Sequence, residues 1–209
     1  MLTESAAQAL SILRDGSQFQ WYVIPLFALV LFVYSVEIER RNWNIVFAGL
    51  AFWGMDWINE IWNSLVLHFT GFAPVWGAPG KTAYLILAGL NFEIMFMFAI
   101  AGIVFTKTLP DKAVKILGMP NRIVLAVGWA AFCVIVEIWL NSVNALTWDY
   151  GWWSASSPIP IFLFGYLHFF VVAFLVHDMK TVRAKAITVG VIFSVAILGL
   201  AVFIPLGWI

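Results

Sequence analysis

Residues 44–67, NIVFAGLAFWGMDWINEIWNSLVL, decide the fold class of this chain. The run is long enough for one transmembrane helix, which needs about 20 mostly apolar residues. Two acidic residues, Asp56 and Glu60, nevertheless lie inside it. An ionisable side chain at bilayer depth is costly unless it is paired, neutralised or hydrated, so such residues mark functional positions. The stretch therefore predicts both a membrane protein and the region where that protein acts.

Composition extends the same conclusion to the whole chain. Of its 209 residues, 63% are hydrophobic and 11% are charged, which excludes an ordinary soluble domain. Because no segment shows the alternating pattern of a membrane β-strand, the spans are predicted to be helices. We expect an all-α, polytopic integral membrane protein built as a six-transmembrane-helix bundle, with an interfacial N-terminal segment at 1–18 and a single membrane domain at 19–209. The predicted spans are 19–37, 44–67, 83–106, 122–146, 158–177 and 186–207.

The basic residues predict the orientation of this bundle. With six spans, only Arg14 and Lys81 of the eleven lysines and arginines fall on the side that holds both termini. Cytoplasmic loops of membrane proteins are enriched in Lys and Arg, so both termini are predicted to lie outside, in a bacterial or other plasma membrane. The basic residues assigned to the cytoplasmic side are Arg40, Arg41, Lys107, Lys112, Lys115, Arg122, Lys180, Arg183 and Lys185.

The predicted outer side is rich in tryptophan. The segment 148–153 reads WDYGWW, and Trp76 lies in the preceding outer loop. One interpretation is a belt of interfacial anchors, and the other is a lid over a cavity. The chain has no net charge, so a nucleic-acid partner is not expected. The expected partners are membrane lipids and a hydrophobic small molecule.

A second acidic segment resembles the first. Glu60-Ile61-Trp62 and Glu137-Ile138-Trp139 share three residues, and both predicted helices run from the inside to the outside. The match indicates either an internal duplication or chance. In both helices further polar residues follow at helical spacing, so each helix presents one polar stripe.

The polar residues of four spans are predicted to converge on one cavity, because groups of this kind in lipid turn towards each other or towards water. The candidate catalytic residues at similar depth are Asp56, Glu60, Glu93, Glu137 and His168. Nearby amides and indoles are candidate substrate-binding residues, although each amide is also suited to plain interhelical hydrogen bonding. These residues are Asn59, Asn63, Asn91, Asn141, Asn144, Trp53, Trp57, Trp62 and Trp139.

Four acids without an intramembrane lysine or arginine favour an enzyme that acts on an apolar, lipid or isoprenoid-like substrate. A protonated carboxyl group donates a proton to an alkene or epoxide, and indole faces stabilise the carbocation by cation–π attraction. In architecture alone, such a protein resembles the small integral-membrane terpene cyclases and sterol isomerases, which are compact bundles with buried acids. No motif of either family is carried over to residues of this chain.

Two alternatives stay open at this point. Glu60, Glu93, Glu137 and His168 offer the ligand types of a carboxylate-rich metal site, although the Glu-x-x-His spacing of di-iron bundles is absent. Membrane-embedded acids also serve as proton or cation relays in transporters. The sequence does not indicate a cofactor.

Overall fold

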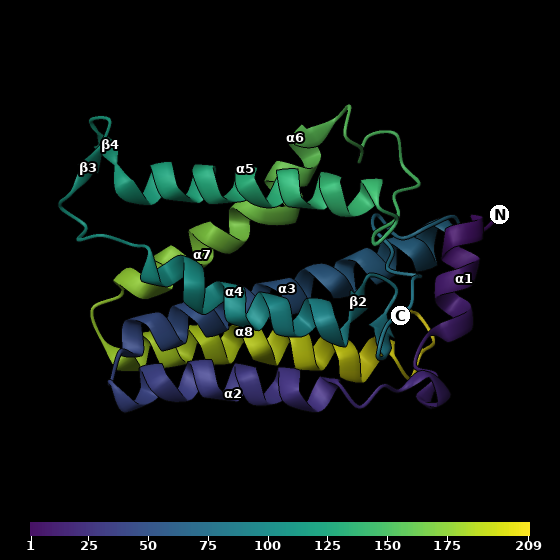
Figure 1. The fold of residues 1–209 in the computed structure, drawn as a ribbon, viewed down its shortest axis with the longest axis horizontal. Helices are drawn as coiled ribbons and strands as arrows, with labels where there is room; N and C mark the ends of the chain where they lie inside the picture. The colour runs from purple at the N-terminus through teal and green to yellow at the C-terminus, as the bar shows by residue number, and fades with distance from the viewer.

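Long α-helices form most of the molecule and lie side by side in one bundle (Figure 1). The computed structural model describes residues 1–209, apart from the side chain of Gln18. This arrangement confirms the predicted α-helical class. The long helices are α2 (Val23–Glu39), α3 (Trp43–Thr70), α4 (Phe92–Lys107), α5 (Asn121–Ser142), α7 (His168–Asp178) and α8 (Val182–Phe203).

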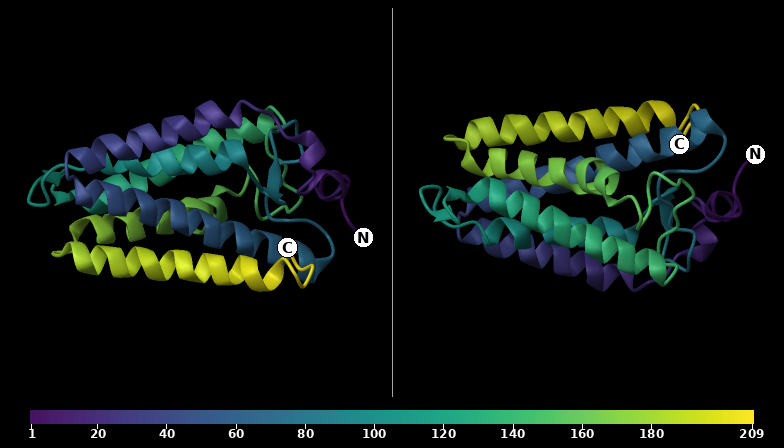
Figure 2. Two further views of the ribbon diagram at one scale, coloured as in Figure 1. Left: turned by 90° about the horizontal axis from the view of Figure 1, so that it is seen from below. Right: turned by 90° about the horizontal axis from the view of Figure 1, so that it is seen from above.

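Short elements close the two ends of the bundle. Helix α1 lies across the end that holds both termini, whereas the β3–β4 pair lies at the opposite end (Figures 1 and 2). Two short antiparallel strand pairs were not expected from the sequence. The short elements are α1 (Glu4–Ile12), η1 (Gly16–Gln18), β1 (Leu85–Leu87), β2 (Leu90–Asn91), β3 (Lys115–Ile116), β4 (Met119–Pro120), α6 (Pro158–Pro160) and η2 (Ile161–Leu167).

Three helical segments of the described chain are long and apolar enough to cross a membrane, namely Asn121–Ser142, Pro158–Asp178 and Val182–Phe203. Helices α2 and α4 have 17 and 16 residues, fewer than the roughly 20 that a span usually needs. The polar residues inside α3 lower its hydropathy. The membrane class is thus supported, while the count of six spans stays a prediction.

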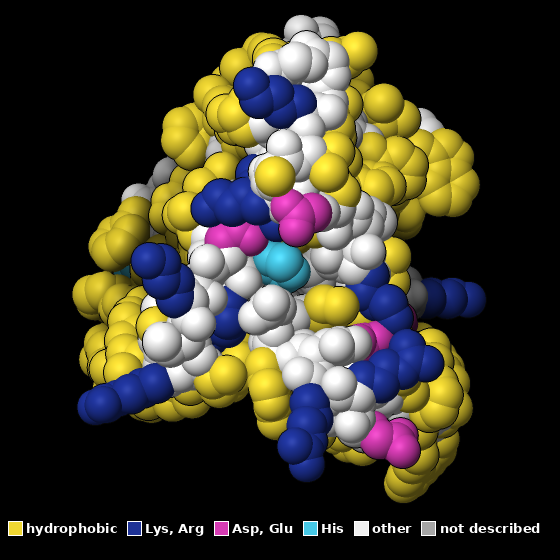
Figure 3. All heavy atoms as spheres, turned by 90° about the vertical axis from the view of Figure 1, so that its left-hand side faces the viewer, with side chains coloured by type: hydrophobic (Ala, Val, Ile, Leu, Met, Phe, Trp, Pro, Cys, Tyr) yellow, Lys and Arg dark blue, Asp and Glu magenta, His cyan; other side chains and the backbone are white. Residues whose placement is uncertain are grey.

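Basic side chains gather at the end of the bundle opposite the two termini, as Figure 3 shows. Several of them bind buried or half-buried acids that join neighbouring helices. Glu37 of α2 is 1% exposed and accepts a 2.5 Å hydrogen bond from Lys107 at the end of α4. Asp178 of α7 binds Arg122 of α5 at 2.9 Å. This end is therefore fixed by ion pairs as well as by short loops.

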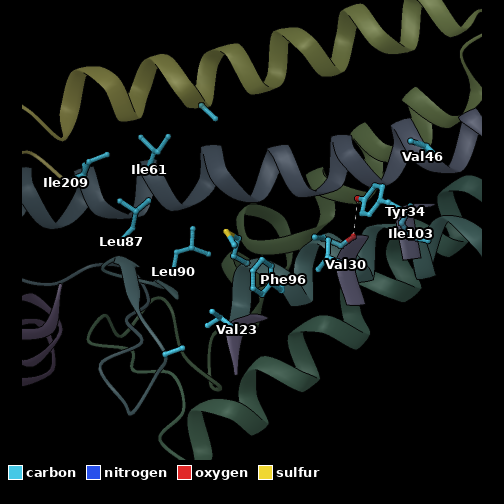
Figure 4. Packing of buried hydrophobic residues seen from close by; sticks show 14 residues of the cluster. Val23, Val30, Tyr34, Val46, Ile61, Leu87, Leu90, Phe96, Ile103 and Ile209 are labelled. Carbon is cyan, nitrogen blue, oxygen red and sulfur yellow. Dashed lines mark hydrogen bonds between the residues drawn. The ribbon is translucent and has the colours of Figure 1, made fainter. Parts of the chain in front are cut away.

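Helix α3 lies at the centre and packs against α4, α7 and α8. Gly49 and Gly102 allow α3 and α4 to approach closely, since a Cβ atom on Gly102 would lie 2.6 Å from the Gly49 carbonyl oxygen. Figure 4 shows apolar side chains from α2, α3 and α4 filling the adjoining core, where Tyr34 donates a hydrogen bond to the Ala99 carbonyl. Small residues at such crossings are typical of membrane helices.

Two predicted spans differ most from the observed helices, while the ends of the others lie within about four residues of the predicted ones. The third span was expected over 83–106, but α4 begins at Phe92, because the Asn91 side chain caps it by accepting a 2.8 Å hydrogen bond from the Ile94 amide. The fifth predicted span, 158–177, contains the π-helical turn η2 between α6 and α7. π-Helical turns insert an extra residue into a helix and are frequent at functional sites.

Candidate intramembrane site

A cavity of about 400 Å³ lies between α3, α4, α5 and η2, beneath the loops of the end that holds both termini, which is called the outer end after the predicted orientation. All four of the predicted acids line it, from three different helices. They are Asp56 and Glu60 of α3, Glu93 of α4 and Glu137 of α5. The sequence pattern thus located residues that the fold brings to one cavity, but their surroundings differ strongly.

Glu60 is 3% exposed and is held by the first outer loop. Its carboxylate accepts a 2.7 Å hydrogen bond from the indole N–H of Trp76 and a 3.4 Å hydrogen bond from the Asn63 amide. Asn63 is fully buried and also binds the backbone of Val75 and Trp76. One turn of α3 therefore fixes both the loop and the carboxylate beneath it.

Glu137 repeats this arrangement with the second outer loop. It is 4% exposed and accepts hydrogen bonds from the indole N–H groups of Trp148, at 3.1 Å, and Trp153, at 3.3 Å. The side chain of Tyr166, from η2, also interacts with this carboxylate. The two Glu-Ile-Trp segments thus have matching roles, each with its glutamate beneath indole donors.

The two glutamate clusters meet through their tryptophans. The rings of Trp76 and Trp153 stack with centroids 5.2 Å apart and an interplanar angle of 27°. The loops themselves are joined by two 2.9 Å backbone hydrogen bonds between Gly77 and Thr147. Of the two interpretations of the tryptophan-rich loops, this geometry corresponds to a lid, since Trp76 and Trp153 both line the cavity.

Asp56 differs from the glutamates because its buried oxygen has no donor. The residue is 2% exposed, and its Oδ2 atom finds no hydrogen-bond partner among the described residues. Asp56 lies one turn before Glu60 on α3 and interacts electrostatically with it. Buried polar atoms are nearly always hydrogen-bonded, so an unpartnered carboxyl oxygen on a residue that lines the cavity favours the neutral, protonated form of that carboxyl group over the charged one.

Glu93 lies at the outer end of its helix rather than near the middle of a span, which corrects the predicted depth. The loop before α4 surrounds its carboxylate with donors: the hydroxyl of Tyr22, the hydroxyl of Thr82 at 2.6 Å and the amide of Ala83 at 2.8 Å. The early start of α4, at Phe92, accounts for this position. Glu93 therefore belongs to the wall of the cavity near its outer side.

His168 does not line the cavity, contrary to the prediction. The π-helical turn places its Nδ1 atom 3.4 Å from the Leu163 carbonyl oxygen, and its ring packs against Phe169. Glu60, Glu93, Glu137 and His168 thus do not form one ligand set. Within the described residues, no group of three or more His, Cys, Asp or Glu side chains is placed to hold a metal ion.

The predicted tryptophans also lie outside the cavity. Trp62 and Trp139 are 39% and 61% exposed on the surface of the bundle, because each follows its glutamate by two positions and so faces away from it. Trp53 packs against Phe193 of α8, and Trp57 belongs to the apolar core. The aromatic residues that do line the cavity are Trp76, Phe98, Trp153 and Tyr166.

The predicted amides divide into two groups. Asn59, Asn91 and Asn144 line the cavity, and Asn59 also donates a 3.2 Å hydrogen bond to the Phe164 carbonyl in η2. Asn63 and Asn141 do not line it. Asn63 anchors the first outer loop, whereas Asn141 donates a 3.0 Å hydrogen bond to the Leu146 carbonyl beyond the end of α5.

Apolar side chains of α4 and α5 form one side of the cavity. Ile94 and Met97 of α4 and Leu140 of α5 line it, and Met97 is 47% exposed. The two helices contact each other nearer the basic end, where the rings of Phe105 and Trp129 lie 4.9 Å apart. The side of the cavity between α4 and α5 is therefore apolar, in contrast to the side that carries the acids.

Comparison with known proteins gives the membrane class but no chemistry. A family model described as "Uncharacterized membrane protein family" matches residues 3–205. A similar protein from Archaeoglobus fulgidus, described as an uncharacterized protein, is 57% identical over 200 residues, which cover 95% of each chain. A second protein from that organism, with the same description, is 51% identical over 53 residues, which cover 25% of this chain and 95% of its own. No solved structure matches.

Proposed function

We propose that this chain, which belongs to the membrane protein family whose model matches residues 3–205, carries out acid–base catalysis on an apolar, lipid or isoprenoid-like substrate in the intramembrane cavity. The observation that carries the proposal is the pairing of an unpartnered carboxyl group, Asp56, with two carboxylates fixed by indoles, Glu60 and Glu137. Catalytic acids and bases need such different surroundings to perform different roles.

The surroundings assign the roles. Asp56 has no donor at its buried oxygen, so it is the group that holds a proton in the resting enzyme. Glu60 and Glu137 accept indole hydrogen bonds, which stabilise charged carboxylates, so they are the proton acceptors. The glutamates also interact electrostatically with each other. Proximity of several acids favours a proton shared among them over three separate charges.

These residues alone supply and remove every proton that an alkene isomerisation requires. Asp56 protonates one carbon of a double bond, and the resulting carbocation lies beside the aromatic side chains that line the cavity. Glu137 then removes a proton from a neighbouring carbon, which moves the double bond. Proton transfer from that glutamate to Asp56 restores the resting state, and no oxidant or other co-reactant is consumed.

The proposal includes the six-span arrangement with both termini outside. Helices α2 and α4 measure about 24–26 Å at 1.5 Å per residue, close to the roughly 30 Å hydrocarbon core. The gathering of basic side chains at one end supports this orientation (Figure 3). The acid cavity then lies in the outer half of the membrane, open to lipid between α4 and α5.

Deuterium incorporation tests the proposal. Purified protein in liposomes is supplied with geranylgeraniol in D₂O, and mass spectrometry measures deuterium bound to carbon, which protonation of an alkene introduces. Glu137→Gln keeps an oxygen for both indoles but cannot accept the proton, so we expect a loss of about 100-fold or more. Glu39→Gln, at an exposed acid of the basic end, is the matched control.

Retention of the full rate by both Asp56→Asn and Glu137→Gln would contradict the assignment. The transport alternative is separated by a flux measurement in the same liposomes. Acid–base catalysis predicts no proton or cation flux above that of protein-free liposomes, whereas a transporter predicts flux that Glu137→Gln abolishes.

A further inference from the structure

A second cavity, of about 540 Å³, lies on the outer side of the molecule between α1, the start of α2 and the loop 79–85. Its lining differs from that of the acid cavity. Its polar groups are two amides, two hydroxyls and one ammonium group, and no acidic side chain is among the described residues that form it. The polar lining residues are Gln8, Gln20, Tyr22, Lys81 and Thr82.

The two cavities share one wall. Gly80 and Lys81 line both of them. Beside this segment, Tyr22 and Thr82 of the outer cavity donate hydrogen bonds to Glu93, which lines the acid cavity. A molecule that occupies the outer cavity therefore lies one short loop segment away from the acids.

Lys81 supplies the positive charge at this wall. It is exposed, and no ion pair or hydrogen bond joins its ammonium group to the described residues. Arg14, the other basic residue of this end, is engaged, since it donates hydrogen bonds to the carbonyls of Ile86, at 3.2 Å, and Ile209, at 2.9 Å. An ammonium group without a protein partner, at the wall of a cavity, is suited to bind an anionic ligand.

We infer that the outer cavity binds the phosphate group of a membrane amphiphile through Lys81, while the apolar chain of that molecule passes Gly80 into the acid cavity. The charges separate the two parts: the acids repel a phosphate, and the ammonium group with nearby amides attracts it. The destination of the chain rests on the proposed function, whereas the phosphate site does not. The inference narrows the substrate class to phosphate-bearing lipids or isoprenoids.

Binding measurements on the purified full-length protein in detergent test this inference. The probes are geranylgeranyl monophosphate, geranylgeraniol and inorganic phosphate, measured by titration calorimetry. We expect the monophosphate to bind about tenfold more tightly than the alcohol, the size of one charge-assisted contact. Lys81→Gln should remove this preference. Lys115→Gln, at an exposed lysine of the opposite end, should keep it.

Each outcome is decisive. Equal affinity for the monophosphate and the alcohol, or an unchanged preference in folded Lys81→Gln, would overturn the phosphate site. If inorganic phosphate binds as tightly as the lipid monophosphate, the cavity is a site for free anions, and the assignment of a membrane amphiphile as its ligand is wrong. A Lys81-dependent preference without deuterium incorporation by the wild-type protein would refute the proposed catalysis and leave the phosphate site standing.

Discussion

At the scale of single residues, the carboxylates of the site are held in place by side chains that take no part in the proposed proton transfer. Asn63 is the clearest case. It is fully buried and binds Glu60 together with the backbone of Val75 and Trp76, so it joins a helix, a loop and a carboxylate. Its role is to hold the carboxylate in place.

Asn63→Ala is expected to lower the free energy of unfolding by about 2–4 kcal/mol, since several buried backbone groups lose their partner. Thermal unfolding of the detergent-solubilised protein measures the change. Asn44→Ala, at an exposed position in the first turn of α3, is the control and should unfold within about 0.5 kcal/mol of the wild type. Equal stability of the two variants would mean that the loop holds without Asn63.

At the scale of elements, the crossing of α3 and α4 depends on the absence of two side chains. Gly49 and Gly102 meet at the point of closest approach, with backbone against backbone. The crossing sets the distance between the helices that carry Asp56, Glu60 and Glu93. Geometry at the acid cavity therefore depends on contacts nearer the basic end.

Gly102→Ala should destabilise the protein by about 1–3 kcal/mol, because the added methyl group forces the helices apart. Gly128→Ala on α5 is the matched control: nothing lies within 4 Å of the added Cβ atom, so no loss is expected. Midpoints of thermal unfolding compare the two. An unchanged midpoint for Gly102→Ala would show that the crossing adjusts freely.

The sequence predicted the helices better than it predicted their ends and faces. Periodicity placed Asp56, Glu60 and Glu137 on the inner side of the bundle, because a polar stripe in an apolar helix has one stable direction. It could not place Glu93, whose depth depends on a cap at Asn91.

Trp76 and Trp153 were missed as site residues, because long-range contacts between loops leave no local sequence pattern. The tryptophan cluster at 148–153 was the only signal of them.

At the scale of the whole molecule, the two ends are built differently. Ion pairs and basic loops close one end, whereas stacked indoles and a strand-like contact between loops close the other. Both termini lie at the indole end (Figures 1 and 2). This asymmetry follows the different surroundings expected on the two sides of a membrane.

Cysteine labelling tests the orientation. In a Cys133→Ala background, Leu2→Cys should react with a membrane-impermeant maleimide in intact cells. Leu117→Cys, in the β3–β4 turn and 90% exposed, should react only after permeabilisation. The reverse pattern would place the acid cavity in the inner half of the membrane and refute the six-span orientation.

The stack of Trp76 on Trp153 also has a consequence for biogenesis. A chain emerges from the ribosome with its N-terminal part first. Glu60 meets its indole donor as soon as the first outer loop is complete, but Glu137 waits for Trp148 and Trp153, which follow it. In a partly synthesised protein, Glu60 can therefore already accept its indole hydrogen bond, whereas Glu137 still lacks its indole donors. The finished pair exists only once the second loop has settled on the first.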